Sequence, residues 1–537
     1  MNLPLALSSF IICTGLVAFV AWWHTRHIDN SSARTFFLAD RRLPWIQVAG
    51  ALLLTNLSTE QIVGLNGAAS VHGAVVMAWE VVPVFALIAM AWYFLPRYWS
   101  GNITTVPEFL EQRFDRTTRR LMGVVFLVTI AFSVLPFVLY SGGVALGDLF
   151  RVHEHLGITP AQARTGMTWA IGLGGCAYVV IGGMKAVALA DTLYGIGLLV
   201  GGLMIPLFGL RHLGAGDLGL GVDRLLAHQA PRLNPIGGAD SNVPFSALFT
   251  GMILINLFYW CTNQMIVQRA FGAKSLAEAQ KGILATAGLK LIGPFFLVVP
   301  GIIAAELFAD AGGVGNGDYS YARLVEAVLP DYLVGFFAAV LLGSIVSAFN
   351  GGLHSVSTLF SIDLYRSWLR PQCSDAEMLQ AGKLFAVGTC VAAILVTGQL
   401  GDSPEGIFTL MKRVMAAFKL PLLAVVAMGM LTSRVPTWAA KSVLTAGVGV
   451  YFLLDWLCAR GGFGFSLHWL HVAGLSTGLL CIFMAAAAWA FPARNVSPTH
   501  ILAHAPALTH WAGLQWASLT VAVAAIALYA LFWRLAG

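Results

Sequence analysis

The sequence predicts an all-α protein that crosses a membrane many times. Of its 537 residues, 58% are hydrophobic and 10% are charged, whereas soluble proteins are about 45–50% apolar and about 25% charged. Apolar stretches of about 18–28 residues, long enough to cross a bilayer, recur to the C-terminus. Polar residues interrupt several of these stretches, at depths where lipid would otherwise surround the chain. These observations exclude a soluble enzyme and favour a transporter.

We expect about 14 transmembrane helices, separated by loops too short for a soluble domain. The first apolar run has neither a basic region before it nor a small-residue cleavage site after it, so it is predicted to be a retained span. The predicted spans are approximately 3–23, 45–70, 73–95, 121–148, 165–182, 189–210, 245–267, 283–305, 333–362, 384–400, 406–430, 437–457, 466–490 and 513–533.

The basic side chains indicate how the chain is oriented in the membrane. The loops after odd-numbered spans carry more than twice as many Lys and Arg residues as the alternate loops and the C-terminus. Such loops are cytoplasmic in membrane proteins. An even number of spans then places both termini outside a plasma membrane, which in bacteria is the inner membrane. The net charge of +6 is therefore a topology signal, and no nucleic-acid partner is expected.

The second span contains the polar run Asn56-Leu-Ser-Thr-Glu-Gln61, followed by Gly64. Polar residues on all faces of one turn are not explained by an amphipathic helix. They are typical of a helix that breaks inside the membrane and turns its backbone carbonyls toward a cavity. The alternative is a long loop between two shorter spans.

Two lone charges lie inside other apolar spans, Glu80 in the third and Lys290 in the eighth. A buried carboxylate requires a cation, a proton or a hydrogen-bonding substrate. Lys290 lies about seven residues inside its span, too deep for its ammonium group to reach water easily. We therefore expect Lys290 to contact Glu80 or a substrate hydroxyl. The alternatives are a structural ion pair for Glu80 and a snorkelling side chain for Lys290.

A second polar interruption includes Asn256, Tyr259, Trp260 and Asn263, whose spacing predicts one shared helical face. Aromatic rings beside amides are typical of sugar sites, because rings cover the apolar face of a pyranose and amides bind its hydroxyls. The alternative is an aromatic belt at the membrane surface. The two interruptions are about 200 residues apart, which indicates a transporter with an inverted repeat.

Three further polar residues indicate a cation site. Ser344 and Ser347 lie one helical turn apart, and their oxygens suit a hard cation such as sodium. The alternative is that these serines pack helices together. Asp191, near the cytoplasmic start of a span, is a candidate for an ion exit path.

Four motifs occur in the order and spacing of a known family. They are the run from Asn56 to Gly64, the segment Gly182-Gly183-Met-Lys-Ala, the run from Asn256 to Arg269, and the run from Ala273 to Gly282. Over about residues 30–430 the chain resembles the solute:sodium symporter family, and within it the bacterial sodium/galactose symporters.

The resemblance implies a LeuT-type fold of two inverted five-helix repeats with flanking helices. It divides the chain into an extra N-terminal helix and loop (1–44), a first repeat (45–211), an extracellular loop (212–244), a second repeat (245–430) and C-terminal helices (431–537).

The same resemblance implies the site residues. The family's sugar site matches Asn56, Gln61, Glu80, Asn256, Tyr259, Trp260 and Lys290. Its outer gate matches Leu65, Trp79 (in place of a Tyr) and Phe408, and its inner gate matches Tyr259. Its sodium site matches the backbone carbonyls of Leu54, Leu57 and Ser344, the hydroxyl of Ser347, and a second hydroxyl that is absent here because the residue is Ala348.

A second departure from the family is Lys412, which aligns with a sugar-binding glutamine and is followed by Arg413. Three interpretations are open. Lys412 pairs with Glu80, binds an anionic sugar such as a uronate, or replaces part of the charge of a weakly bound sodium ion. The alternative is that both cations face water in a vestibule.

The sequence thus predicts a carrier that imports a galactose- or glucose-like sugar or a polyol with sodium by alternating access, without any other cofactor. Because of Ala348 and Lys412, a sodium-independent or proton-coupled sugar carrier and a carrier of anionic sugars remain as alternatives. A membrane sensor would carry a long cytoplasmic extension, but the chain ends just after its last span. An enzyme is not expected, since no nucleophile–base or metal constellation is apparent.

Overall fold

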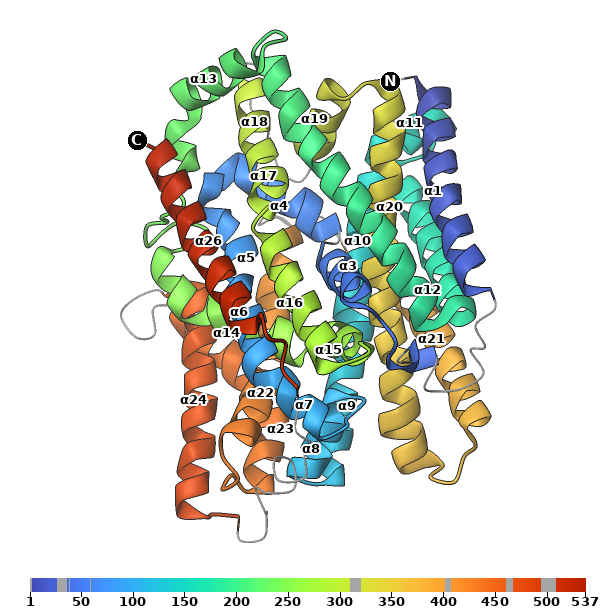
Figure 1. The fold of residues 1–537 in the computed structure, drawn as a ribbon, viewed down its shortest axis with the longest axis vertical. Coiled ribbons are helices and arrows are strands. Elements are labelled where there is room, and N and C mark those ends of the chain that lie inside the picture. The colour runs from blue at the N-terminus through green and yellow to red at the C-terminus, as the bar shows by residue number, and fades with distance from the viewer. Residues whose placement is uncertain are drawn as a thin grey trace.

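The protein is a bundle of long helices. The computed structural model describes residues 2–26, 36–37, 39–57, 59–309, 320–400, 407–459, 467–493 and 509–537. Within these ranges the regular structure is helical, apart from one isolated β-bridge between Leu43 and Ala273. Figure 1 shows both termini at the same end of the bundle.

The first half of the chain contributes twelve α-helices among the described residues. They are α1 (Leu3–Thr25), α3 (Trp45–Asn56), α4 (Thr59–His72), α5 (Ala78–Val81), α6 (Pro83–Ala89), α7 (Leu95–Ser100), α8 (Val106–Arg113), α9 (Arg116–Thr129), α10 (Leu135–Leu149), α11 (Val152–Leu156), α12 (Pro160–Leu213) and α13 (Leu218–Gln229).

The second half contributes twelve more in its described part. They are α14 (Gly251–Leu257), α15 (Gln264–Phe271), α16 (Leu276–Lys290), α17 (Gly293–Leu297), α18 (Val299–Leu307), α19 (Ser320–Val328), α20 (Asp331–Thr358), α21 (Asp375–Thr397), α22 (Ile407–Leu431), α23 (Thr437–Ala459), α24 (Trp469–Ala490) and α26 (Leu514–Leu535).

Shorter helical segments join several of these helices. Four are π-helical, namely η3 (Met90–Phe94), η4 (Ile130–Val134), η7 (Phe258–Thr262) and η10 (Leu359–Leu369). Four are 3₁₀-helical, namely η1 (Ala39–Arg41), η2 (Gly73–Met77), η5 (Ala230–Leu233) and η6 (Phe245–Phe249).

Most of the predicted spans overlap with these helices, but the end of the second predicted span and the third lie in one long helical stretch, Gln61–Ser100. Eleven helices of the described chain are long and apolar enough to cross a membrane, and the bent pair Leu276–Lys290 and Gly293–Leu307 makes up to 12. Two shorter apolar helices, Trp45–Asn56 and Gly251–Thr262, occupy the places of the second and seventh predicted spans. Both shorter helices end at the polar interruptions noted above, because there the membrane helix is broken.

Helix α12 includes two spans, Pro160–Gly182 and Met184–Leu213. The Tyr178 hydroxyl donates a hydrogen bond to the Ala186 carbonyl (2.9 Å). In a straight α-helix, residues eight apart are separated by about 12 Å along the axis. A tyrosine side chain is too short to bridge that distance, so the chain turns sharply at this junction. The turn allows two spans to follow each other without a loop.

Half-helices α3 and α4 lie in the middle of the bundle, between α12, α16 and α18 (Figure 1). The Asn66 amide fixes α4 against the second half of the chain. Its nitrogen donates to the carbonyls of Ile62 (2.7 Å) and Phe296 (3.3 Å), and its oxygen accepts from the Gly301 backbone N–H (3.1 Å). A Cβ at Gly301 would lie 2.2 Å from the Asn66 carbonyl oxygen, so only glycine allows this close contact between α4 and α18.

Candidate functional site

The first helix break lies at Leu57. Helix α3 ends at Asn56, and the backbone of Leu57 leaves the helix with φ −84° and ψ 63°. Helix α4 then begins at Thr59. The short polar side chains of this run compete with the backbone for hydrogen bonds, which weakens a helix. The break places Asn56 on one half-helix and Gln61 on the other, facing the same centre.

A buried ion pair lies beside this break. Lys290, the last residue of α16, donates from Nζ to Glu80 Oε2 in α5 (2.7 Å), and both side chains are completely buried. The same Nζ donates to Asn56 Oδ1 (2.5 Å). The other Glu80 oxygen, Oε1, accepts from Gln61 Nε2 (2.5 Å). Removing two charges from water costs several kcal/mol per ion, so such a network persists only when most of its hydrogen bonds are made.

Close helix packing brings this network together. A Cβ at Gly293, three residues after Lys290, would lie 2.6 Å from Glu80 Oε2. The glycine therefore lets the start of α17 pass directly against the carboxylate. The expected partnership of Glu80 with Lys290 is present in the structure, and it joins α5 and α16 to both halves of the broken helix.

Lys412 extends the network on the opposite side of Gln61. Its Nζ lies 3.4 Å from Gln61 Oε1 and 5.4 Å from the centroid of the Trp79 ring, and the side chain is half-buried. Arg413, the next residue, donates to Asp455 in α23 (2.9 Å). The two adjacent cations therefore have different surroundings, and of the two it is Lys412 that reaches the site.

The second break lies at Asn263. The π-helix η7 precedes it, and the Asn263 backbone is extended, with φ −72° and ψ 119°. The Asn263 side chain caps α15 by accepting from the Met265 N–H (3.1 Å). The prediction that Asn256, Tyr259, Trp260 and Asn263 share one α-helical face is therefore wrong, because a π turn and then a break change the directions of their side chains.

The residues around the second break have different partners, although the rings of Tyr259 and Trp260 contact each other with centroids 5.3 Å apart. The completely buried ring of Trp260 lies 5.5 Å from Lys290 Nζ, which joins it to the Glu80 network. Asn256 donates to the Met252 carbonyl of its own helix (3.0 Å). Tyr259 is half-buried, and its ring lies 5.7 Å from the Nζ of Lys419.

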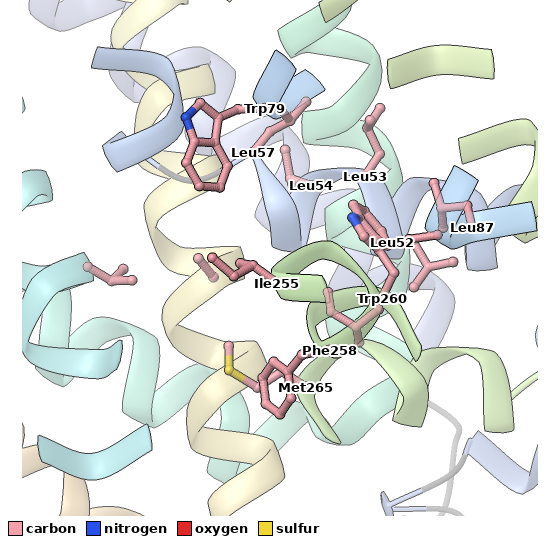
Figure 2. Packing of buried hydrophobic residues seen from close by; sticks show 14 of the residues in the cluster. Leu52, Leu53, Leu54, Leu57, Trp79, Leu87, Ile255, Phe258, Trp260 and Met265 are labelled. Carbon is pink, nitrogen blue, oxygen red and sulfur yellow. The ribbon is translucent and has the colours of Figure 1, made fainter. Parts of the chain in front are cut away.

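Apolar side chains surround both breaks. Figure 2 shows Leu52, Leu54 and Leu57 of the first half with Phe258 and Trp260 of the second, all within one continuous buried cluster. Leu65, expected at the outer gate, is fully buried in α4. The side chain of Phe408 lies outside the described residues. These apolar neighbours exclude water from the network, which strengthens each of its polar contacts.

Trp79 is covered by a residue that the sequence did not single out. Its ring stacks on Trp469 at the start of α24, with centroids 6.2 Å apart and planes at 14°. Burial lowers the pKa of the preceding His468 to about 4, so this imidazole is neutral near pH 7. Lys419 was also overlooked, although it is a charged residue in the same predicted apolar span as Lys412 and Arg413.

The candidate sodium ligands lie on two elements. Leu54, Leu57, Ser344 and Ser347 are buried, as is Ala348. Ser344 Oγ donates to the Leu341 carbonyl (2.9 Å). Asp191 pairs with Arg269 (3.3 Å), and Asp191, Ser347 and Asn350 line a cavity of about 240 Å³ between α1, α12 and α20.

Comparison with known proteins identifies the family. A model of the sodium:solute symporter family matches residues 36–447. The chain belongs to this family. This symporter is 41% identical over 526 residues to the uncharacterized symporter YidK of Escherichia coli (strain K12), covering 98% of this chain and 90% of the relative. It is 32% identical over 414 residues to the sodium/glucose cotransporter of Vibrio parahaemolyticus, covering 73% and 74% of the two chains.

More distant relatives also carry the names of sodium-coupled transporters. The symporter is 26% identical over 525 residues to the sodium/myo-inositol cotransporter 2 of Bos taurus, covering 89% of this chain and 75% of the relative. Its fold matches a substrate-bound outward-open structure of a Na⁺-coupled sialic acid symporter, with a TM-score of 0.76, 18% identity and coverage of 91% and 99%. The protein is thus a sodium-coupled transporter with a LeuT-like fold, and not an enzyme.

Proposed function

We propose that this symporter imports a sugar or a cyclic polyol together with sodium by alternating access, across the inner membrane of a bacterium and with both termini outside. The network of Glu80, Lys290, Asn56 and Gln61 carries the proposal. A hydroxyl both donates and accepts, so it can enter between an ammonium and a carboxylate without leaving either unpaired. Relatives named for glucose and myo-inositol handle polyhydroxylated rings.

We assign the sugar hydroxyls to Asn56, Gln61, Glu80 and Lys290, with Asn256 and Lys412 at the edges of the site. The rings of Trp260 and Tyr259 cover the apolar face of the sugar. Leu65, Trp79 and Phe408 form the outer gate, and Tyr259 forms the inner gate. Since Glu80 and Lys290 are completely buried, the site is closed around these two residues, and substrate enters only after a gate has moved.

We assign sodium to the carbonyl oxygens of Leu54, Leu57 and Ser344 and to the hydroxyl of Ser347. The carbonyls of Leu54 and Leu57 come from the end of half-helix α3. An ion there holds the break in one conformation, and thereby orders Asn56 and Gln61 for the sugar. Coupling requires only that both ligands prefer the same state. Asp191 and its cavity provide the path by which sodium leaves.

Uptake into proteoliposomes tests this function. Labelled galactose and glucose are offered with an inward sodium gradient, or with choline in place of sodium. We expect accumulation above the outside concentration only with sodium. Glu80→Gln should abolish it, while Glu326→Gln, which removes the same charge from a pair with Arg151 outside the site, should retain it. Equal entry in sodium and choline would contradict the proposal.

A further inference from the structure

A groove of about 940 Å³ is lined by α9 and η4 on one side and by η10 and α21 on the other. Most of its lining side chains are apolar, and several are largely exposed, such as Val128 (46%), Phe132 (57%) and Leu384 (72%). The rings of Phe360 and Phe385 stack with centroids 3.9 Å apart and join η10 to α21. Because all four elements belong to membrane spans, the groove faces lipid.

The length of the groove fits one leaflet of a bilayer. Along α21 the lining extends from Glu377 to Ala392, and 15 residues of α-helix span about 22 Å. One leaflet with its polar region is about 20–22 Å thick. Gly388 lies between the two ends, and a Cβ there would meet no atom within 4 Å. This side of α21 therefore leaves room for an acyl chain.

The two charged lining residues, Arg370 and Glu377, lie at the same end of the groove. This end adjoins the loop between the spans Asp331–Leu369 and Asp375–Thr397, which places both charges at a membrane surface. The distribution of basic residues predicts that this loop is cytoplasmic. The groove thus begins at the level of the lipid headgroups of the inner leaflet and continues among their acyl chains.

Both charges are available to a ligand. Among the described residues, the guanidinium of Arg370 has no hydrogen-bond or ion-pair partner. Arg366, in the same segment, differs because it pairs with Asp375 (2.9 Å). Glu377 Oε2 accepts from the Ser374 backbone N–H (2.9 Å), whereas its Oε1 has no partner in the same part of the chain. The groove therefore offers one cation and one carboxylate oxygen at the headgroup level.

Another hollow on the outside of the bundle lacks this feature. It has a volume of about 670 Å³, lies between α6, η6 and α26, and is lined without any charged residue. Apolar walls accept acyl chains but do not distinguish one headgroup from another. Charge complementarity with a headgroup is therefore a property of the groove beside α21.

We propose that this groove binds a phospholipid with an ethanolamine headgroup. Its acyl chains lie along α9 and α21, Arg370 binds its phosphate, and Glu377 accepts a hydrogen bond from its ammonium group. A choline headgroup has the same charge but no N–H donor, so Glu377 favours ethanolamine. A glycerol headgroup leaves the phosphate without a cation for Glu377, whose charge then repels that phosphate. The proposal is independent of which solute is transported.

Native mass spectrometry of the purified symporter in detergent tests the site, because it counts the lipids bound at each lipid concentration. Dioleoyl phosphatidylethanolamine, phosphatidylcholine and phosphatidylglycerol are titrated separately. For the wild type we expect one tightly bound phosphatidylethanolamine. Its apparent Kd should be about fivefold or more below those of the other two lipids, the effect of about one charge at a membrane surface.

Two charge variants test the headgroup contacts. Arg370→Gln should raise the Kd of phosphatidylethanolamine about fivefold, whereas Arg366→Gln, outside the groove lining, should leave it within about twofold. Glu377→Gln should bring the Kd values of the ethanolamine and choline lipids within about twofold of each other. Glutamine at this position still caps α21, so the helix is preserved.

A third variant tests the groove itself. Gly388→Trp fills it and should abolish the tightly bound lipid. The matched control Gly478→Trp, on α24, also adds a side chain where a Cβ meets no atom within 4 Å, and it should retain the lipid. Equal unfolding temperatures of all variants in detergent without added lipid will show that the variants are folded.

Several results would overturn the proposal. They are equal Kd values for the three lipids in the wild type, an unchanged Kd in Arg370→Gln, and a tightly bound lipid that remains in Gly388→Trp. Glycerophosphoethanolamine, which lacks acyl chains, should not compete with the lipid, and competition would indicate a site for a soluble phosphate instead. A wild-type dimer that Gly388→Trp converts to a monomer would show that a second copy of the chain occupies the groove.

Discussion

Two buried ion pairs occupy the centre of this symporter, and they are built differently. Lys290 and Glu80 are 2.7 Å apart, and their other partners are the side-chain amides of Asn56 and Gln61. Asp191 and Arg269 are 3.3 Å apart, and the remaining Arg269 nitrogens donate to the backbone carbonyls of Ala51 (3.2 Å) and Met265 (3.0 Å).

This difference in partners distinguishes an ion pair that can bind a substrate from one that holds helices together. Side-chain amides change rotamer at little cost, so the Glu80 pair can exchange partners with a substrate. Backbone carbonyls are fixed by their helices, so Arg269 ties α3 to α15 and holds the two broken helices together. Asp191 faces a cavity on its other side, where a cation can approach it. We therefore propose that the first pair binds the substrate, and that the second combines a structural role with passage of the ion.

The largest expected effect concerns the first pair. Glu80→Ala leaves the buried Lys290 ammonium without its carboxylate, and losing one partner of a buried pair costs about 3–5 kcal/mol of unfolding free energy. Transport should be abolished. The double variant Glu80→Ala/Lys290→Met removes both charges and should recover most of the stability, measured by thermal unfolding in detergent, but no uptake. If the double variant regained uptake, the pair would be structural only and would not bind the substrate.

A smaller effect is expected at the second pair. Asp191→Asn keeps the side-chain shape, and Arg269 retains its backbone acceptors, so the variant should fold. We expect the sodium concentration for half-maximal uptake to rise about tenfold, as for one lost charged interaction, with an unchanged maximal rate at saturating sodium. Asp375→Asn, in the exposed pair with Arg366, serves as control. A sodium dependence and a maximal rate both equal to those of the wild type would show that Asp191 does not act on the ion.

The smallest effect is expected at the assigned sodium site. Ala348→Ser adds the second hydroxyl beside Ser347, and one hydroxyl contact contributes about 0.5–1.5 kcal/mol. Half-maximal uptake should then require about threefold to tenfold less sodium. Ala381→Ser, on α21 and outside the predicted site, should change nothing. Sodium dependence identical to that of the wild type would exclude residue 348 from the ion's ligands.

Much of the candidate site could be predicted from the sequence, because the residues that indicate it lie within short segments of the chain. A polar run within an apolar span indicated the first break, and single charges at positions 80 and 290 indicated a pair. The stacking of Trp469 on Trp79 could not be predicted, since it depends on how α24 packs against a helix almost 400 residues away. The π turn before Asn263 was missed because residue spacing was interpreted with the α-helical period.

Sodium-dependent sugar binding to the purified symporter is the most direct test of coupling between the two proposed sites. The dissociation constant of galactose is measured by equilibrium binding at increasing sodium, with choline keeping the ionic strength constant. We expect sodium to lower this constant, the sugar to increase sodium affinity by the same factor, and Glu80→Gln to eliminate sugar binding while sodium still binds. A dissociation constant independent of sodium, or sugar binding unaffected by Glu80→Gln, would contradict this expectation.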